Sequence, residues 1–323
     1  MITRRGVVGG LIAGGAALPK SALAQAYPTH PVRIIVPFAP GGGADIVSRL
    51  ISPYMQASLG QSVIVENRSG AAGRIGTGVV AKSDPDGHTL LVSTESSLVI
   101  APHIGQSIGY DPLKDFAPVS LLTRNTVMLV VHPSVPAQTL QEFMALARAK
   151  PGELFYASSG VGGPNHLAGE IFNRMTGLKI THVPFQGTGL AIQAVISNQV
   201  GAMWGFMAGL IPHIRGGALR ALAVGSLERS KALPEVPTVA EAGVPGYEAV
   251  SWIGMVAPAR LPAPVMDKLS GAVHSAMMEK TVTDNLIGGG SEIVAGKPDE
   301  FRQVMERDFA KYGKLSDLFK TAN

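Results

Sequence analysis

The chain has 323 residues, of which 15% are charged, with 27 basic and 23 acidic residues, a formal net charge of +4 and no cysteine. A balance this close to neutral argues against a nucleic-acid or membrane-surface partner, and the lack of cysteine excludes a disulfide framework. The chain is long enough for two domains of ordinary size.

The first residues have the pattern of an export signal. Arg4 and Arg5 precede an apolar run over 7–18, and small residues follow at 22 and 24. The apolar run is shorter than the roughly 20 residues that span a bilayer, so we predict a cleaved signal peptide over 1–24 rather than a membrane anchor. Cleavage after Ala26 fits almost as well, and the two arginines fit both the Sec and the twin-arginine route. We therefore expect a periplasmic protein.

Strand-like and helix-like segments alternate after this signal. The predicted strands are 32–36, 63–65 and 88–93, and the predicted helices between them are 44–59 and 71–82. The first helix shows apolar residues at helical spacing and ends at Gly60. This β-α-β order predicts a mostly parallel sheet covered by helices.

A second set of alternating segments follows, and then a C-terminal part. The second set comprises strands at 127–132, 154–157, 180–183, 202–204 and 219–224 and helices at 140–150, 164–175 and 190–197; strand 252–256 and helices 264–278 and 298–314 come last. No low-complexity linker separates the sets. We therefore expect two α/β domains joined by crossing hinge strands, one made of 27–126 with 250–323 and the other of 127–249.

Three glycine-rich loops, over 37–45, 158–166 and 184–189, each follow a predicted strand and open a helix. Free N–H groups and the helix dipole at such a position favour an anion, and glycine lets it approach the backbone. None of the loops contains Lys or Arg, which favours a small acid over a triphosphate. Thr94 to Ser97 add hydroxyl donors after the third strand. The alternative is that each loop is an ordinary turn.

Several side chains near these loops have two possible roles. His166 is a ligand contact or a capping residue, and Asp45 is a ligand contact or a cap for its own helix. Phe38 and Phe185 either form apolar walls of a site or pack in the core. Trp204 and Trp252 are expected in the core.

Two segments match enzyme motifs, but the residues around them do not suit the structures that these motifs require. Gly105 to Gly109 match G-x-S-x-G, but Pro102 before them and Pro112 after them do not suit a strand-turn-helix elbow. Gly76 to Ala81 match G-x-G-x-x-A, yet no strand ends directly before them. The eight histidines have no metal-binding spacing. We predict no catalytic residues, no metal, no cofactor and no enzymatic activity.

Five segments, in order along the chain, resemble the Bug family of extracytoplasmic receptors of tripartite tricarboxylate transporters. They are the P-F-A-P-G-G-G-A-D segment from Pro37, V-E-N-R-S-G-A-A-G from Val65, S-S-G followed by H-L-A-G-E from Ser158, H-V-P-F-Q-G from His182 and V-P-T-V-A-E-A-G from Val236. The resemblance covers the chain from about Tyr27 to the last helix.

The resemblance implies a type II periplasmic-binding-protein fold, whose two domains close on a small carboxylate held largely by backbone amides. The implied contacts are Phe38, Gly42, Ala44, Asp45, Thr94, Ser158, Ser159, His166, Gly187 and Thr188. It further implies membrane permease subunits as partners, and we expect a monomer. An orphan or sensory binding protein that reports to a signalling partner remains the alternative.

Three positions depart from the family pattern. Gln186 stands where the family often has Lys, and Ala194 and Gly205 stand where it often has Asp. Fewer acidic side chains near a cleft disfavour a ligand with an amine, so we expect a plain carboxylate or a more apolar acid.

Overall fold

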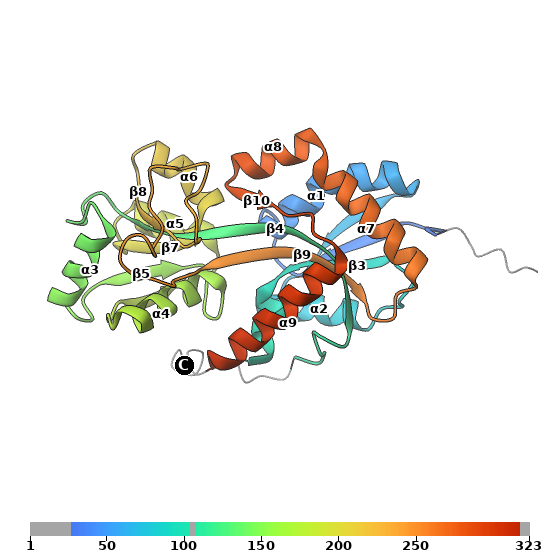
Figure 1. Cartoon of the computed structure of the whole chain (residues 1–323), viewed down its shortest axis with the longest axis horizontal. Coiled ribbons are helices and arrows are strands. Elements are labelled where there is room, and N and C mark those ends of the chain that lie inside the picture. Colours follow the sequence, from blue (N-terminus) through green and yellow to red (C-terminus); the bar gives the residue numbers. More distant parts are fainter. Residues whose placement is uncertain (1–26, 104–107, 317–323) are drawn as a thin grey trace, which may run out of the picture.

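The computed structural model describes residues 27–103 and 108–316, which form two lobes side by side (Figure 1). The predicted signal peptide lies outside these residues. In the first lobe, β1 (Val32–Val36) pairs in parallel with β2 (Val63–Asn67) and β3 (Thr89–Thr94). β9 (Val250–Pro258) and the first part of β4 (Phe116–Val131) continue this sheet in antiparallel fashion, and β10 (Ser291–Ile293) pairs with β4.

Helices cover both faces of this first sheet. α1 (Gly43–Leu59), α7 (Ala263–Met278) and α8 (Lys280–Gly288) share an apolar core with one face. α2 (Arg74–Ala81), preceded by the short turn η1 (Ala71–Gly73), packs on the other face with η2 (Ser96–Ile100), η3 (Ala101–His103) and α9 (Pro298–Lys314). A sheet covered on both faces explains why its strands are continuous apolar runs.

The second lobe has the same layered design. Its sheet joins the last part of β4 to β7 (Ala202–Phe206) and β8 (Arg220–Val224), and then continues through β5 (Phe155–Ser158) to β6 (Thr181–Pro184). α3 (Leu140–Ala149) and α4 (Pro164–Thr176) cover one face, and α5 (Thr188–Ile196) and α6 (Met207–Arg215) cover the other.

Two strands connect the lobes. β4 pairs with β9 up to Thr126 and with β7 from Val127 onward, so this one strand belongs to both sheets. β9 returns beside it, and Figure 1 shows the two strands running side by side between the lobes. At the crossing, Gly225 donates to the carbonyl of Val127 at 2.7 Å and accepts from the N–H of Ala249 at 2.8 Å. A Cβ at Gly225 would lie 2.8 Å from both Val127 and Ala249 carbonyl oxygens, so only glycine fits this junction.

The predicted mixed α/β fold with crossing strands is confirmed, but the sequence did not predict four of its features. The strand expected to begin at Val127 begins at Phe116, and α6, α8 and β10 were not expected. Trp204 and Trp252 are buried, as expected. Within the described ranges, no helix is long and apolar enough to cross a membrane.

Candidate functional site

Three helices begin at the carboxyl ends of strands with glycine at the N-cap. Gly42 precedes α1 in the first lobe, and Gly163 and Gly187 precede α4 and α5 in the second. Glycine has no side chain that could bond to the N–H groups of the first helical turn, whereas Ser, Thr, Asp or Asn at this position would use them. No side chain caps these three helix starts, and the positive end of the helix dipole lies behind each; at α4 the first helical residue, Pro164, has no N–H, so its donors begin at the next residue.

Asp45 holds the loop of the first lobe in shape. Its carboxylate accepts the N–H of Gly41 at 2.9 Å, the guanidinium of Arg49 at 3.0 Å and the amide of Asn67 at 2.9 Å. Burial acts to raise the pKa of Asp45, but these hydrogen bonds outweigh it and hold the pKa below its usual range. The carboxylate is thus committed to its own lobe: it fixes the turn before α1 and leaves the N–H groups of α1 free.

The two loops of the second lobe support each other. Ser158 and Pro184 lie opposite each other in the β5–β6 pair, and the N–H of Phe185 donates to the carbonyl of Ser158 at 3.0 Å. The Ser158 hydroxyl lies 3.2 Å from the N–H of Gly160 and 2.7 Å from Nε2 of His182. The starts of α4 and α5 are therefore neighbours.

A pair of histidines lies behind these loops. The rings of His166 and His182 are 4.1 Å apart, and the N–H of Gly162 donates to Nδ1 of His166 at 3.1 Å. Burial lowers the pKa of His166 to about 4, and burial followed by the neighbouring His166 lowers the pKa of His182 to about 3. Both rings are therefore neutral near pH 7, and the bond from Gly162 places the proton of His166 on Nε2.

The lobes meet next to these loops. Glu95, directly after Thr94 at the end of β3, lines a small space together with Pro164 and Leu167 from the start of α4. Leu167 also belongs to the apolar core of the first lobe. The Thr94 loop and the start of α4 thus approach each other from opposite lobes.

The ten residues predicted to contact a ligand fall into two groups. Partly or fully exposed are Phe38, Gly42, Thr94, Ser159, Gly187 and Thr188, whereas Ala44, Asp45, Ser158 and His166 are buried. Phe38 also packs against the core of the first lobe, and Phe185 packs partly buried in the second. The exposed group offers backbone N–H groups, three hydroxyls and one aromatic ring, and the buried group supports the loops from behind.

Three polar residues of this region were not predicted. His182 bonds to Ser158, and Asn165 and Glu95 are buried, each with one side-chain oxygen that lacks a hydrogen-bond partner among the described residues. Asn165 lies within the predicted loop 158–166, and its amide side chain is a signal that sequence analysis could have used. No local pattern marks Glu95, because its burial depends on segments far away in sequence.

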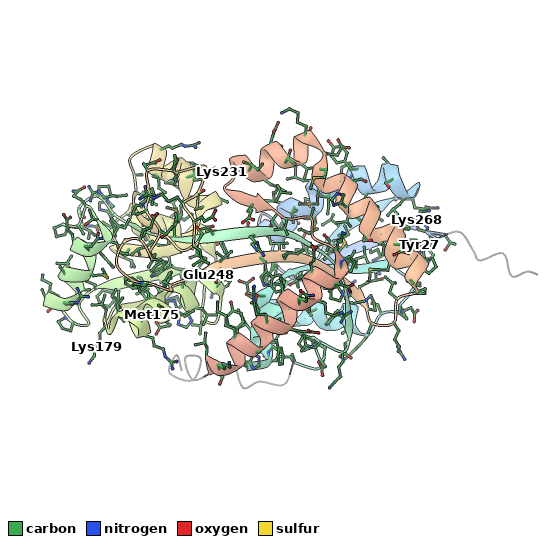
Figure 2. The ribbon with its side chains drawn as sticks, in the orientation of Figure 1. Tyr27, Met175, Lys179, Lys231, Glu248 and Lys268 are labelled. Atoms are coloured by element: carbon green, nitrogen blue, oxygen red, sulfur yellow. The ribbon has the colours of Figure 1, made fainter. Side chains whose placement is uncertain are left out.

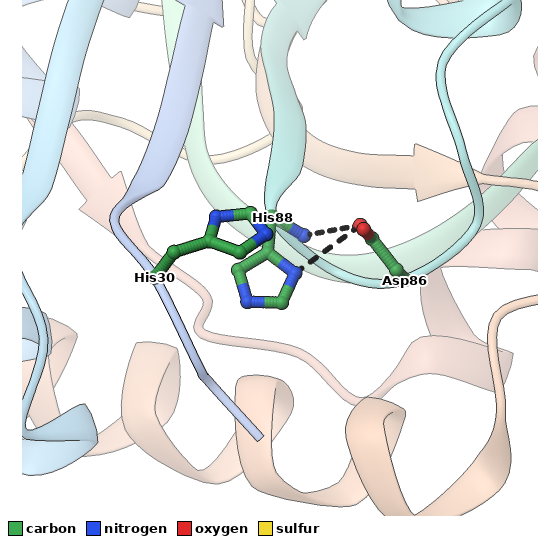
Figure 3. A group of neighbouring side chains, drawn as sticks. All are labelled: His30, Asp86 and His88. Atoms are coloured by element: carbon green, nitrogen blue, oxygen red, sulfur yellow. Dashed lines mark hydrogen bonds and ion pairs between the residues drawn. The ribbon is translucent and has the colours of Figure 1, made fainter. Parts of the chain in front are cut away.

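One cluster has the residue types of a metal site. His30, Asp86 and His88 place three ligand atoms within 4.8 Å of one another (Figure 3). However, the N–H of Thr29 donates to Nε2 of His88 at 3.2 Å. A neutral His88 ring therefore carries its proton on Nδ1, which lies 3.3 Å from the carboxylate of Asp86, so neither ring nitrogen has a free lone pair for a metal. The His30 and His88 rings are also stacked, with centroids 3.6 Å apart, so their in-plane lone pairs do not converge.

Contacts next to this cluster hold the segment that begins at Tyr27 in place. Tyr27 donates its hydroxyl to the carbonyl of Gly87 at 2.8 Å, and Lys268 donates to the carbonyl of Tyr27 at 2.7 Å. Figure 2 shows Tyr27 and Lys268 together at the end of the first lobe that lies away from the second lobe.

Two other candidate sites lie outside the loops. The glycines of the G-x-G-x-x-A match are inside α2, as expected from the missing strand, so they cannot form a dinucleotide-binding turn. A pocket of about 650 Å³ lies between α4 and α9 and is lined by Arg174, Arg307, Lys311 and Lys314 together with Glu248 and Asp308. Its acids offset part of this charge, and none of the three glycine loops lines it.

Comparison with known proteins identifies the family. Residues 47–319 match the family described as tripartite tricarboxylate transporter family receptor. The chain is 37% identical to protein BugT of Bordetella pertussis over 308 residues, which cover 95% of this chain and 94% of BugT.

Solved structures agree with this assignment. A Rhodopseudomonas palustris protein, Rpa4515 with adipate, has a TM-score of 0.84 and 33% identity and covers 91% of this chain and 98% of its own. MatC of the same organism, with bound malate, has a TM-score of 0.81 and 33% identity over 90% of this chain and 100% of its own. These relatives are solute-binding proteins and not enzymes, as the sequence predicts. The chain therefore belongs to the tripartite tricarboxylate transporter receptor family, which includes the Bug proteins and has the periplasmic-binding-protein fold.

Proposed function

We propose that this chain is an exported solute receptor that captures a small carboxylate between its two lobes and delivers it to a tripartite tricarboxylate-type permease. The observation that carries this proposal is the glycine N-cap at three helix starts, which provides donors for an acid on both lobes without a cationic side chain. The adipate and malate bound to two relatives support the ligand class.

In this proposal the exposed group of predicted residues contacts the ligand. The N–H groups at the start of α1 approach it from the first lobe, and those of α4 and α5 approach it from the second. Thr94, Ser159 and Thr188 add hydroxyl donors, and the ring of Phe38 forms an apolar wall. The buried group, which includes Asp45, Ser158 and His166, fixes the loops.

The lobes close by bending the two crossing strands. We place the domain boundaries at 126–127 in β4 and 249–250 before β9, where the chain passes from one sheet to the other. The ligand stabilises the closed state because only that state brings donors of both lobes to it.

A ligand without an amine fits this site best. Asp45, the acid nearest to the loop of the first lobe, is already bonded to Arg49, Asn67 and Gly41, so its charge is not available for an ammonium group. Ala194 is buried on α5 and Gln186 at the β6–α5 loop is neutral, so neither adds a negative charge near the loops.

Titration calorimetry with adipate, malate, succinate, an aromatic acid and aspartate tests the proposal, with the diamide of adipate as the uncharged control. We expect binding of at least one plain acid, weaker binding of aspartate than of succinate, and no binding of the diamide. A clear preference for aspartate would refute the expected ligand class. The proposal that the protein is a carboxylate receptor would be refuted by two results together: none of the acids binds, and mass spectrometry finds a non-acidic solute on the natively purified protein.

A further inference from the structure

Glu95 has a buried carboxyl group in which one oxygen accepts hydrogen bonds and the other has no hydrogen-bond partner among the described residues. The residue is 1% exposed, and Oε2 accepts the hydroxyl of Ser251 at 2.8 Å and the N–H of Trp252 at 3.1 Å. Oε1 has no hydrogen-bond partner among the described residues. A carboxylate with an oxygen left bare in an enclosed place is costly, whereas the protonated acid is much less so.

Part of the cover over Glu95 comes from the other lobe. A space of about 10 Å³ beside Glu95 is lined by one face of α4, made of Pro164, Leu167, Ala168 and Ile171. That face has no polar side chain. Ala249 and Val250 at the crossing of the strands line the same space, so separating the lobes at this crossing would withdraw α4 and admit water to the carboxyl.

The charged groups around Glu95 come from the first lobe and the crossing segment. On α9 they are Asp308, paired with Arg307 at 2.9 Å, as well as Lys311 and the phenol of Tyr312. Glu248 precedes β9 near the middle of the molecule (Figure 2). Burial and then the charge of Asp308 raise the pKa of Glu95 to about 7, against the lowering effect of Ser251 and Trp252.

We propose that Glu95 is a proton-binding site at the junction of the lobes, so that closing the lobes on a carboxylate takes up one proton and opening them releases it. The proposal rests on the lobe closure proposed above. It adds a second ligand, the proton, to the receptor. By linkage, the proton and the acid then strengthen each other's binding.

The size of the effect follows from the two states of Glu95. If the pKa of about 7 that Glu95 has in the described structure is that of the closed state, and the open state has the ordinary value of about 4.3, binding takes up about 0.9 proton at pH 6, about 0.5 at pH 7 and about 0.1 at pH 8. Affinity for the acid is then about tenfold weaker at pH 8 than at pH 6.

Calorimetry of adipate binding in buffers of different ionisation enthalpy measures this proton uptake directly. We expect the unmodified protein to show the uptake just described, and Glu95→Gln to bind with no uptake and no change of affinity between pH 6 and pH 8. Glu248→Gln is the matched control because it removes a nearby acid that no apolar cover buries; it should keep the uptake. No uptake in the unmodified protein, or uptake that persists in Glu95→Gln, would overturn the proposal.

A second readout works without a ligand. The chain has no cysteine, so Gln56→Cys in the first lobe and Gln199→Cys in the second can carry a pair of dyes. We expect the closed fraction of the unliganded protein to increase from pH 8 to pH 6, and Glu95→Gln to remove this dependence. If adipate failed to bind but this dependence were present, the proton site would stand and the proposed ligand would be wrong. A closed fraction that does not depend on pH would refute the proton site.

Discussion

The loops of the two lobes expose the same kind of backbone donor but are supported in different ways. In the first lobe a charged group, Asp45, is bonded to Gly41, Arg49 and Asn67. In the second lobe the support is neutral and comes from the neighbouring rings of His166 and His182 and the hydroxyl of Ser158. The comparison teaches that free N–H groups need a rigid loop and not one particular side chain. Both supports should lose their contribution to stability as the pH falls, the neutral one at a higher pH than the charged one.

The largest expected effect comes from blocking the donors on either side. Gly42 and Gly163 have φ of −77° and −81° with extended ψ, a conformation open to any residue, and a Cβ on either would have no contact closer than 3.6 Å. Gly42→Val and Gly163→Val should each weaken adipate binding, measured by calorimetry, by at least about 100-fold, or about 2.7 kcal/mol, because the side chain covers the donors.

These two variants should still fold. Valine is a poorer N-cap than glycine, so we expect the free energy of unfolding in urea to fall by about 1 kcal/mol. Gly271→Val, on the exposed side of α7, is the control and should leave binding unchanged. If only one of the two N-cap variants lost binding, the ligand would depend on one lobe alone.

Acid should weaken the neutral support of the second lobe. The pKa of His166 is lowered to about 4, so the unfolded chain takes up this proton below about pH 6.5 while the folded protein does not. Its contribution to stability is therefore full above about pH 6.5 and declines as the pH falls toward 4. Between pH 7.5 and pH 5 the unmodified protein should lose about 2 kcal/mol more than His166→Gln in urea unfolding. Equal losses in the two proteins would show that His166 is not held neutral.

The charged support of the first lobe should respond to pH in the same direction, but at a lower pH. The pKa of Asp45 is held below its usual range, so its stabilisation is present at neutral pH and is lost only as the pH falls through that lowered value. Asp45→Asn should cost about 1.5 kcal/mol in urea unfolding at pH 7, because one oxygen becomes a donor that cannot accept from Gly41 or Asn67. Glu66→Gln weakens two partly exposed ion pairs, with Arg33 and with Arg68, and should lower the free energy of unfolding by less than Asp45→Asn does. A smaller loss in Asp45→Asn than in Glu66→Gln would contradict this account.

Sequence patterns were sufficient for most of the fold and for the position of the loops. Mostly apolar runs marked β1 and β3, and the glycine-rich loops after β1, β5 and β6 marked the starts of α1, α4 and α5, since both signals are local. The first half of β4 was missed because Pro118 lies within it. The strand tolerates this proline where its register with β9 shifts, between Pro118 and Ser120, and that shift depends on the partner strand.

The division of the predicted site into exposed and buried residues could not come from the sequence. Thr94 and Glu95 are neighbours, yet one is partly exposed and the other is buried by α4, which starts about 70 residues later. In the same way, nothing near Asp45 indicates that Asn67 from the next strand would take one of its oxygens. Contacts between distant segments decide which polar group faces the ligand.

The smallest expected effect tests whether the second lobe can also use charge. Gln186 is exposed at the loop before α5, and Gln199 is exposed beyond the far end of the same helix. Gln186→Lys should strengthen adipate binding three- to fivefold at low salt, about 1 kcal/mol or less, because an exposed cation near the site attracts the dianion and is screened as salt increases. Gln199→Lys adds the same charge away from the loop and should change affinity less than twofold. Equal gains from both variants would show that only net charge matters and that the position of residue 186 is not part of the site.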